Sequence, residues 1–265
     1  MDILKRSLAP ITDEAWGEIQ EQAKKTLTST LTARKFVDVV GPKGWDYTVV
    51  PTGRLTIPEH QAKDGVKYGI YQVQPLIETR VPFELDIWEL DNIVRGARDI
   101  ELQPLIDAAR KAALFEEHAI YHGFKEGAIA GLVASIEHKA IPAGDNPGGF
   151  LQALVKGVAM LTQSSVGGPY ALVVNPELWA AMSGSIQGYP LTKRVQNIID
   201  GPTIPCPAIQ DAFLVSLRGG DLELIIGQDF SIGYEAHDGK KVKLFLTESF
   251  TFRVLDPSVL LRLNK

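Results

Sequence analysis

Hydrophobic and polar residues alternate most regularly in the last quarter of the chain. Apolar side chains recur at every second position between Val242 and Val254, which places them on one face of a strand. Glu248 alone interrupts this face. Asp238 and Gly239 precede it, and an Asp-Gly pair between alternating runs is a strong hairpin signal. We therefore predict a sheet that contains strands at residues 222–226, 230–234 and 242–254.

Apolar positions spaced three and four residues apart predict the helices. Trp16 and Ile19 begin a stripe that predicts an amphipathic helix over 13–34. Thr12 is a suitable N-cap for this helix. A broader apolar band predicts a long helix over 102–125, which neighbours must cover on much of its circumference. We also expect shorter helices at 148–162, 176–182 and 190–199, and strands at 34–40 and 170–174.

The segment at residues 47–83 alternates only weakly and is interrupted by prolines and glycines. Such a segment is poor at building its own core. A lone hairpin is marginally stable and leaves open sheet edges, which invite pairing with another chain. Two interpretations therefore stay open, an arm used in assembly and a long flexible surface loop.

Composition excludes several classes of protein. With 265 residues, 45% hydrophobic and 22% charged, the chain can bury a full core and is not expected to be disordered. A net charge of −5 argues against a nucleic-acid partner. No run approaches the roughly 20 apolar residues of a membrane span, and the opening residues do not form a secretory signal. Its single cysteine cannot form an internal disulfide, so we expect a cytoplasmic protein.

Two histidines have the spacing of a metal-binding pair. His118 and His122 lie four residues apart on the predicted long helix, and Glu117 is adjacent. The metalloprotease pattern requires glutamate directly after the first histidine, where Ala119 stands, and no third ligand is signalled. We favour a surface or interface role for the pair and predict no metal and no cofactor.

Other reactive residues also favour structural interpretations. Cys206 lies between two prolines without a helix N-terminus to lower its pKa, which is typical of a structural thiol. The acidic residues around Trp88 are better explained as a solvated or ion-paired face than as a metal site. Glu248 is expected to pair with an arginine or to face a subunit boundary, because an unpaired buried charge is costly. We predict no enzymatic activity.

Several sequence blocks occur in a fixed order over residues 4–257. They include Leu4-Lys-Arg-Ser-Leu-Ala-Pro10, Arg34-Lys-Phe-Val-Asp38, Leu85-Asp-Ile-Trp-Glu-Leu-Asp-Asn92, Gly227-Gln-Asp-Phe-Ser-Ile-Gly-Tyr-Glu235 and Thr247-Glu-Ser-Phe-Thr-Phe252. Together they resemble the encapsulin shell proteins, a nanocompartment family (family 1) also described as linocin-type bacteriocins. One block alone would be weak, but their shared order over nearly the whole chain is specific.

The resemblance implies an α+β protein with the HK97-type phage capsid fold, which has a peripheral domain, an apical domain and an extended E-loop. On this basis residues 1–46 contain the N-terminal helix and first strand of the peripheral domain. The E-loop arm follows at 47–83, and the peripheral domain continues with its spine helix at 84–133. The apical domain is expected at 134–224 and the C-terminal peripheral sheet at 225–265.

In that family, copies assemble into an icosahedral shell around cargo enzymes, commonly a ferritin-like protein or a dye-decolourising peroxidase. Iron storage and resistance to oxidative stress are therefore expected contexts. Because the arm lacks insertions, we expect a homo-oligomer of about 60 copies instead of roughly 180 or 240. The cargo carries a C-terminal targeting peptide, which docks on the inner wall between the N-terminal helix and the peripheral sheet.

By position, the resemblance gives candidates for the peptide site and for a pore. The expected peptide-binding residues are Leu27, Leu31, Arg34, Asp38, Asp229, Phe230 and Ile232. Leu27 and Leu31 could instead be ordinary core residues. A loop of small uncharged residues is expected to line the five-fold pore, at Ser183, Gly184, Ser185, Ile186, Gln187 and Gly188.

Three other functions remain as alternatives. A phage major capsid protein would share the fold but package DNA, and its inner surface would be more basic. A metal-dependent hydrolase would have to use His118 and His122. A secreted antibacterial protein would need a signal sequence, and the opening residues do not resemble one.

Overall fold

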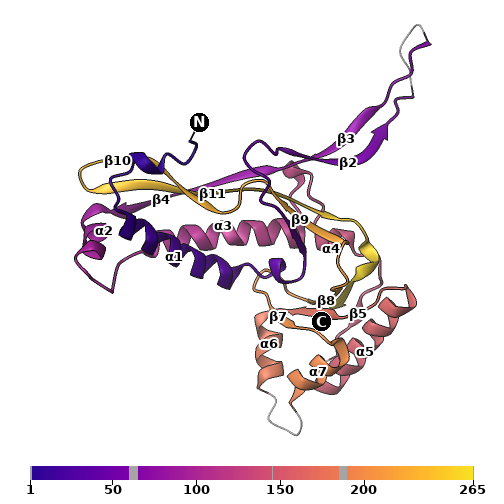
Figure 1. Ribbon diagram of the computed structural model, residues 1–265. Helices are drawn as coiled ribbons and strands as arrows, with labels where there is room; N and C mark the ends of the chain where they lie inside the picture. The colour runs from indigo at the N-terminus through magenta and orange to yellow at the C-terminus, as the bar shows by residue number, and fades with distance from the viewer. Residues whose placement is uncertain (1, 60–64, 145, 185–189, 265) are drawn as a thin grey trace.

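A computed structural model describes residues 2–59, 65–144, 146–184 and 190–264. Two five-stranded sheets organise these residues, and a two-stranded hairpin projects away from them (Figure 1). The first sheet contains β1 (Asp38–Val40), β9 (Leu222–Ile226), β11 (Lys241–Val254), β10 (Ser231–His237) and β4 (Ile77–Asp86). The second contains β5 (Ile141–Pro142), β12 (Leu260–Asn264), β8 (Ala212–Ser216), β6 (Tyr170–Val174) and β7 (Thr203–Pro205).

Strand β11 is the centre of the first sheet. It pairs antiparallel with β10 over its first half, with β4 from Lys241 to Phe250, and with β9 from Phe250 to Val254. Asp238 closes the β10–β11 hairpin, and its carboxylate accepts hydrogen bonds from the backbone N–H groups of Lys240 and Lys241, both at 2.8 Å. The predicted strands and hairpin are confirmed.

Helices α1 and α3 cover one face of the first sheet (Figure 1). The helices are α1 (Asp13–Thr30), α2 (Ile87–Val94), α3 (Gln103–His122), α4 (Leu132–Ser135), α5 (Pro147–Gln163), α6 (Pro176–Ser183) and α7 (Leu191–Ile199). Thr12 caps α1, as predicted, by accepting a hydrogen bond from the N–H of Ala15. Asn146 and Asn175 cap α5 and α6 ahead of their first-turn prolines.

The second sheet and helices α5, α6 and α7 form a separate lobe at the bottom of Figure 1. Every residue of β6 and β8 is buried. The continuous apolar run at 170–174 therefore predicted a buried strand correctly. Residues 225–265 do not form one sheet, because β12 pairs with β5 and β8. The chain thus returns to the second lobe at its end, which differs from the expected division.

The first helix is shorter than predicted, since α1 ends at Thr30 and not at residue 34. The hydroxyl groups of Thr26, Ser29 and Thr30 bond to helix carbonyls, and such bonds weaken a helix end. A 3-10 turn (η2, Ala33–Lys35) follows, so the strand expected at 34–40 begins only at β1. The long helix likewise ends at His122, before the residue 125 that the pattern predicted.

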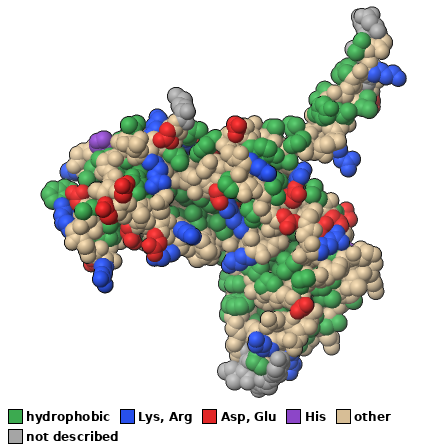
Figure 2. Space-filling view, viewed as in Figure 1, with side chains coloured by type: hydrophobic (Ala, Val, Ile, Leu, Met, Phe, Trp, Pro, Cys, Tyr) green, Lys and Arg blue, Asp and Glu red, His purple; other side chains and the backbone are tan. Residues whose placement is uncertain are grey.

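The arm consists of β2 (Val49–Thr56) and β3 (Ile70–Pro75), which pair with each other and with no other strand among the described residues. Residues 77–83, which the sequence placed in the arm, belong to β4 and pair with β11. Hydrophobic side chains gather along the projecting hairpin (Figure 2). They include Leu55, Ile57, Ile70, Tyr71 and Val73, all exposed.

Two hydrophobic clusters lie end to end along α3 and β11. One contains Ala113 of α3 and Leu246 of β11. The other contains Ile120 of α3 and Phe250 of β11, and extends into the second lobe. Charged residues lie at the boundary between these clusters, and the candidate site is built on them.

Candidate functional site

A groove of about 360 Å³ runs between α1, the N-terminal segment and the start of β10. Its walls contain six of the seven residues expected to bind a peptide: Leu27, Leu31, Arg34, Asp229, Phe230 and Ile232. The seventh, Asp38, does not line the groove. It lies in β1, where its carboxylate accepts a 2.6 Å hydrogen bond from the N–H of Gly220.

Helix α1 and its C-cap residue Leu31 supply one wall of the groove. Trp16 and Ile19 are buried in the cluster shared with α3. Leu27 and Leu31 belong to the same cluster but also reach the groove. The two interpretations of these leucines are therefore compatible, since each residue contributes to the core and to the groove wall.

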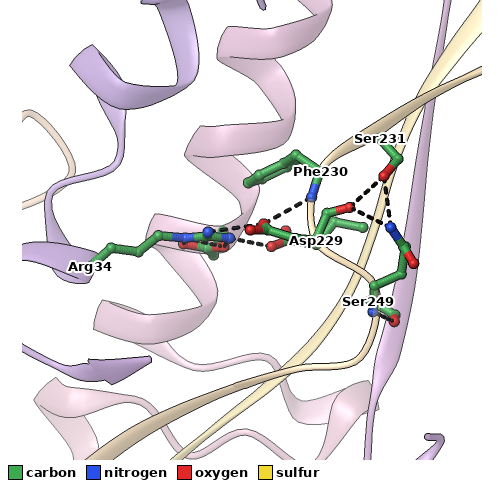
Figure 3. Close-up of polar contacts among 8 residues, drawn as sticks. Arg34, Asp229, Phe230, Ser231 and Ser249 are labelled. Atoms are coloured by element: carbon green, nitrogen blue, oxygen red, sulfur yellow. Dashed lines mark hydrogen bonds and ion pairs between the residues drawn. The ribbon is translucent and has the colours of Figure 1, made fainter. Parts of the chain in front are cut away.

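Arg34 lines the groove and is held by three carboxylates (Figure 3). Its Nε donates to Glu116 at 2.9 Å, its Nη1 to Asp229 at 3.0 Å, and its Nη2 also to Glu248. Burial lowers the pKa of Arg34, but the hydrogen bonds and charges of these acids outweigh it and raise the pKa above its ordinary value. The family resemblance placed Arg34 among the expected peptide-binding residues, but its guanidinium group is already engaged within the chain.

Glu248 pairs with Arg34, which confirms the expectation that an arginine would pair with this residue. Its side chain is 1% exposed and that of Glu116 is 0% exposed. Glu248 Oε2 has no hydrogen-bond partner among the described residues. Burial raises the pKa of Glu248 well above its ordinary value, the charge of Glu116 adds to this rise, and Arg34 opposes it.

The opposite wall is a turn between β9 and β10. Asp229 Oδ1 accepts a 2.9 Å hydrogen bond from the N–H of Phe230, as well as the bond from Arg34. The guanidinium carbon of Arg34 lies 5.1 Å from the ring centre of Phe230. Ser231 and Gln228 hold the other side of the turn through a 2.8 Å side-chain bond (Figure 3). Arg34 therefore positions both residues of the wall.

A second buried acid fixes the backbone just before Arg34. Glu117 accepts hydrogen bonds from the N–H groups of Thr32 and Ala33 at 2.8 and 2.9 Å, and from the Thr32 hydroxyl. Burial raises the pKa of Glu117 to about 7. Sequence reasoning missed this role, because Glu117 only drew attention as a neighbour of His118.

The N-terminal segment forms a wall that the sequence did not predict. Leu4 and Arg6 line the groove, together with Gln20 and Lys24 of α1. The carbonyl of Leu4 accepts a 2.8 Å hydrogen bond from the N–H of Tyr234 at the edge of the sheet. These residues lack a periodic pattern, and the only signal for them was their place in the opening sequence block.

The other candidate residues do not join this groove. The rings of His118 and His122 lie 4.9 Å apart, and His122 Nε2 contacts the carbonyl of Ala208 at 2.8 Å. Within the described ranges, no group of three or more His, Cys, Asp or Glu side chains is arranged to hold a metal ion. Cys206 is buried, as expected, and its thiol lies 3.7 Å from Glu117 Oε2. Trp88 is exposed on α2.

The pore candidates lie at the end of α6. Ser183 is its last residue and Gly184 its C-cap. Ser185, Ile186, Gln187 and Gly188 lie outside the described residues. Separately, no helix in the described part of the chain combines the length and hydropathy that crossing a bilayer requires.

Comparison with known proteins identifies the family of this chain. The family model described as encapsulating protein for peroxidase matches residues 1–251. The chain belongs to the encapsulin shell proteins. The type 1 encapsulin shell protein of Rhodospirillum rubrum is 44% identical over 268 residues, which cover 97% of this chain and 94% of that protein. This encapsulin is thus a shell protein of a nanocompartment, and the resemblance noted in the sequence is confirmed.

Solved structures confirm the capsid fold of this encapsulin. The virus-like particle of Pyrococcus furiosus has a TM-score of 0.69 at 17% identity, and the match covers 94% of this chain and 98% of that one. The capsid of the myovirus XM1 has a TM-score of 0.55 at 13% identity, with 88% and 91% covered. At these identities the likeness concerns the fold alone.

Proposed function

We propose that this encapsulin closes into an icosahedral shell of about 60 copies and loads a cargo enzyme through the cargo's C-terminal targeting peptide. The observation that carries the proposal is the groove, because six residues expected from the family resemblance meet there although they come from distant parts of the chain. A ferritin-like protein or a dye-decolourising peroxidase is the proposed class of cargo. The shell itself takes no part in the cargo's chemistry.

The chemistry of the groove suits a short extended peptide. Leu27, Leu31 and Ile232 offer aliphatic surface, and Phe230 adds an aromatic wall. Pockets of this kind bind aliphatic side chains by removing apolar surface from water. Because Arg34 is already paired with acids, we now assign it to shaping the wall and not to contacting the peptide.

The projecting arm supports self-assembly. Tyr71 is 75% exposed and Ile57 is 71% exposed in the single chain. A monomeric soluble protein rarely exposes contiguous apolar surface of this kind. Pairing with neighbouring copies would bury this surface. We therefore favour the assembly arm over the flexible surface loop.

The peptide site is tested by substituting Phe230 with alanine in assembled shells. The probe is a fluorescent protein fused to the C-terminal segment of a ferritin-like protein or peroxidase from the source genome. Loss of a central aromatic contact costs about 2 kcal/mol, so we expect roughly thirtyfold weaker binding. Fluorescence that co-purifies with the shells measures the loading.

The control is Leu8→Ala, which truncates an exposed side chain that does not line the groove. Electron microscopy of both variants checks that closed particles form. If intact Phe230→Ala shells carry as much probe as the Leu8→Ala shells, the peptide does not bind in this groove.

DNA packaging is the alternative with the same fold. The likeness to phage capsids stays below 25% identity and concerns the fold alone. The relative from Rhodospirillum rubrum, which is 44% identical over nearly the whole chain, is an encapsulin shell protein. The net charge of −5 gives no electrostatic support for enclosing DNA. We therefore do not favour this function.

A further inference from the structure

Four charged residues meet beneath the peptide groove, and their charges do not balance. Arg34 supplies one positive group, whereas Glu116, Glu248 and Asp229 supply three carboxyl groups within ion-pair distance of it. Arg34, Glu116 and Glu248 have largely apolar surroundings, because they lie between the two hydrophobic clusters. Three ionised acids around one guanidinium would leave excess negative charge in a poorly solvated site.

Glu248 is the acid best placed to stay neutral. Its Oε1 binds Arg34, but its Oε2 has no partner among the described residues. A buried, partnerless oxygen is far less costly in a neutral carboxyl group than in an ionised one. In agreement with this geometry, burial raises the pKa of Glu248 well above its ordinary value.

Asp229 is the acid best placed to leave the cluster. Its side chain is 47% exposed, whereas the other two acids are almost fully buried. When negative charge increases in the cluster, the solvated carboxylate can move away at the lowest cost. Its departure would break the bond to Arg34 and disturb its bond to the N–H of Phe230.

We propose that a proton on Glu248 holds the Asp229–Phe230 wall of the groove against Arg34, and that loss of this proton at higher pH releases the wall and weakens peptide binding. Glu248 is thus a positioning residue that never contacts the peptide. The binding part of this inference rests on the proposed function, while the movement of the wall does not.

The surrounding elements leave few other charges that could account for such a response. On β4, Glu78 and Arg80 lie opposite Ser249 and Thr247 of β11, the two neighbours of Glu248 in the chain. Because side chains alternate along a strand, Glu78 and Arg80 therefore lie on the face of the sheet away from Glu248. On α1, Lys24 lines the groove. In the N-terminal segment, Arg6 lies over the ring of Trp16 at 4.2 Å. On η2, Lys35 follows Arg34.

Glu117 is the remaining neighbour and the main competitor as the source of a pH response. It follows Glu116 on α3, but its carboxylate binds the backbone of Thr32 and Ala33 and not Arg34. The variants Glu248→Gln and Glu117→Gln therefore separate the two acids. Glu248→Gln keeps the shape and neutrality that we assign to this residue.

The wall is followed by hydrogen exchange of residues 227–233 in assembled shells at pH 6 and pH 9, corrected for intrinsic exchange rates. In the wild type we expect protection to fall about tenfold at pH 9. Glu248→Gln should keep its pH 6 protection at both pH values, whereas Glu117→Gln should respond like the wild type. Light scattering reports whether the shells stay closed. The protection of the wall can be compared between the wild type and the two variants whether the shells are closed or open.

The fluorescent probe described above is then titrated into the same samples. We expect wild-type affinity to fall about tenfold between pH 6 and pH 9, and Glu248→Gln to bind equally at both. Unchanged wild-type protection, or the same loss of protection in Glu248→Gln, overturns the inference. If the wild type binds no probe at either pH, the proposed cargo function fails, while the exchange data still decide whether the wall moves.

Discussion

At the scale of single residues, a few buried acids organise the region where the two hydrophobic clusters meet. Glu116 and Glu117 are adjacent on α3, yet they serve different partners. One holds the side chain of Arg34, and the other holds the backbone of Thr32 and Ala33. Helix α3 therefore fixes the turn after α1 through both the turn's backbone and the Arg34 side chain, and this turn places Arg34 at the groove.

Glu117 should make stability depend on pH. Its pKa is about 7 in the fold against an ordinary 4.5, so its favourable contribution is complete below pH 4.5 and disappears as pH rises to about 7. A shift of this size corresponds to at most about 3 kcal/mol. We expect Glu117→Gln to lose less stability than the wild type between pH 5 and pH 8, measured by thermal unfolding.

The matched control for this prediction is Glu126→Gln, because Glu126 is an exposed acid just beyond the end of the same helix. It should follow the wild-type curve. An equal fall in melting temperature for the wild type and Glu117→Gln would show that Glu117 does not titrate in this range.

At the scale of elements, β11 joins parts of the molecule that differ in environment. Its first half packs on α1 and α3 through Leu244 and Leu246, and its second half reaches the other cluster through Phe250. The alternating pattern predicted this strand and its face. Glu248 interrupts the pattern where one cluster ends and the other begins.

The loop after α6 is the element proposed to line the five-fold pore. In a symmetric shell each substitution is repeated around the axis, so Ser185→Arg or Gln187→Arg would create a ring of positive charge. We expect slower entry of cationic substrates and an altered rate for anionic ones. Turnover of enclosed cargo, compared with free cargo, measures this effect.

The control is Glu126→Arg, because Glu126 is exposed and lies far in the sequence from the loop after α6. This variant should leave the turnover of enclosed cargo unchanged. If the two loop variants also leave substrate entry unchanged in closed shells, residues 183–188 do not line the path that substrates take.

At the scale of the whole molecule, the arm is the part least suited to a solitary chain. Its side chains Tyr71 and Val73 are exposed on the same strand face. Aspartate at both positions should leave the two lobes folded but prevent closed particles, because charge would be buried between copies. Negative-stain microscopy and light scattering measure the outcome.

Gln72→Asp is the matched control, since its position lies between the two on β3 and faces the other way. The wild type is expected to give uniform particles of about 60 times the 29.0 kDa chain mass. Closed particles from the double variant, or a stable wild-type monomer, would contradict assembly through the arm.

The sequence by itself determined the elements whose pattern is local. The strand at 170–174, the β10–β11 hairpin and the capped helices α5 and α6 follow from periodicity, Asp-Gly and Asn-Pro signals. The encapsulin resemblance added the fold and six residues of the groove. These features depend on neighbours in the chain or on shared ancestry, so the sequence contains them directly.

Only the tertiary structure decided which distant residues meet. The pairing of β12 with the second sheet, the capture of Thr32 by Glu117, and the wall formed by Leu4 all join segments far apart in the chain. The same holds for the acids around Arg34. Their ionisation depends on burial and on each other's charge, which are properties of the packed molecule that no local pattern records.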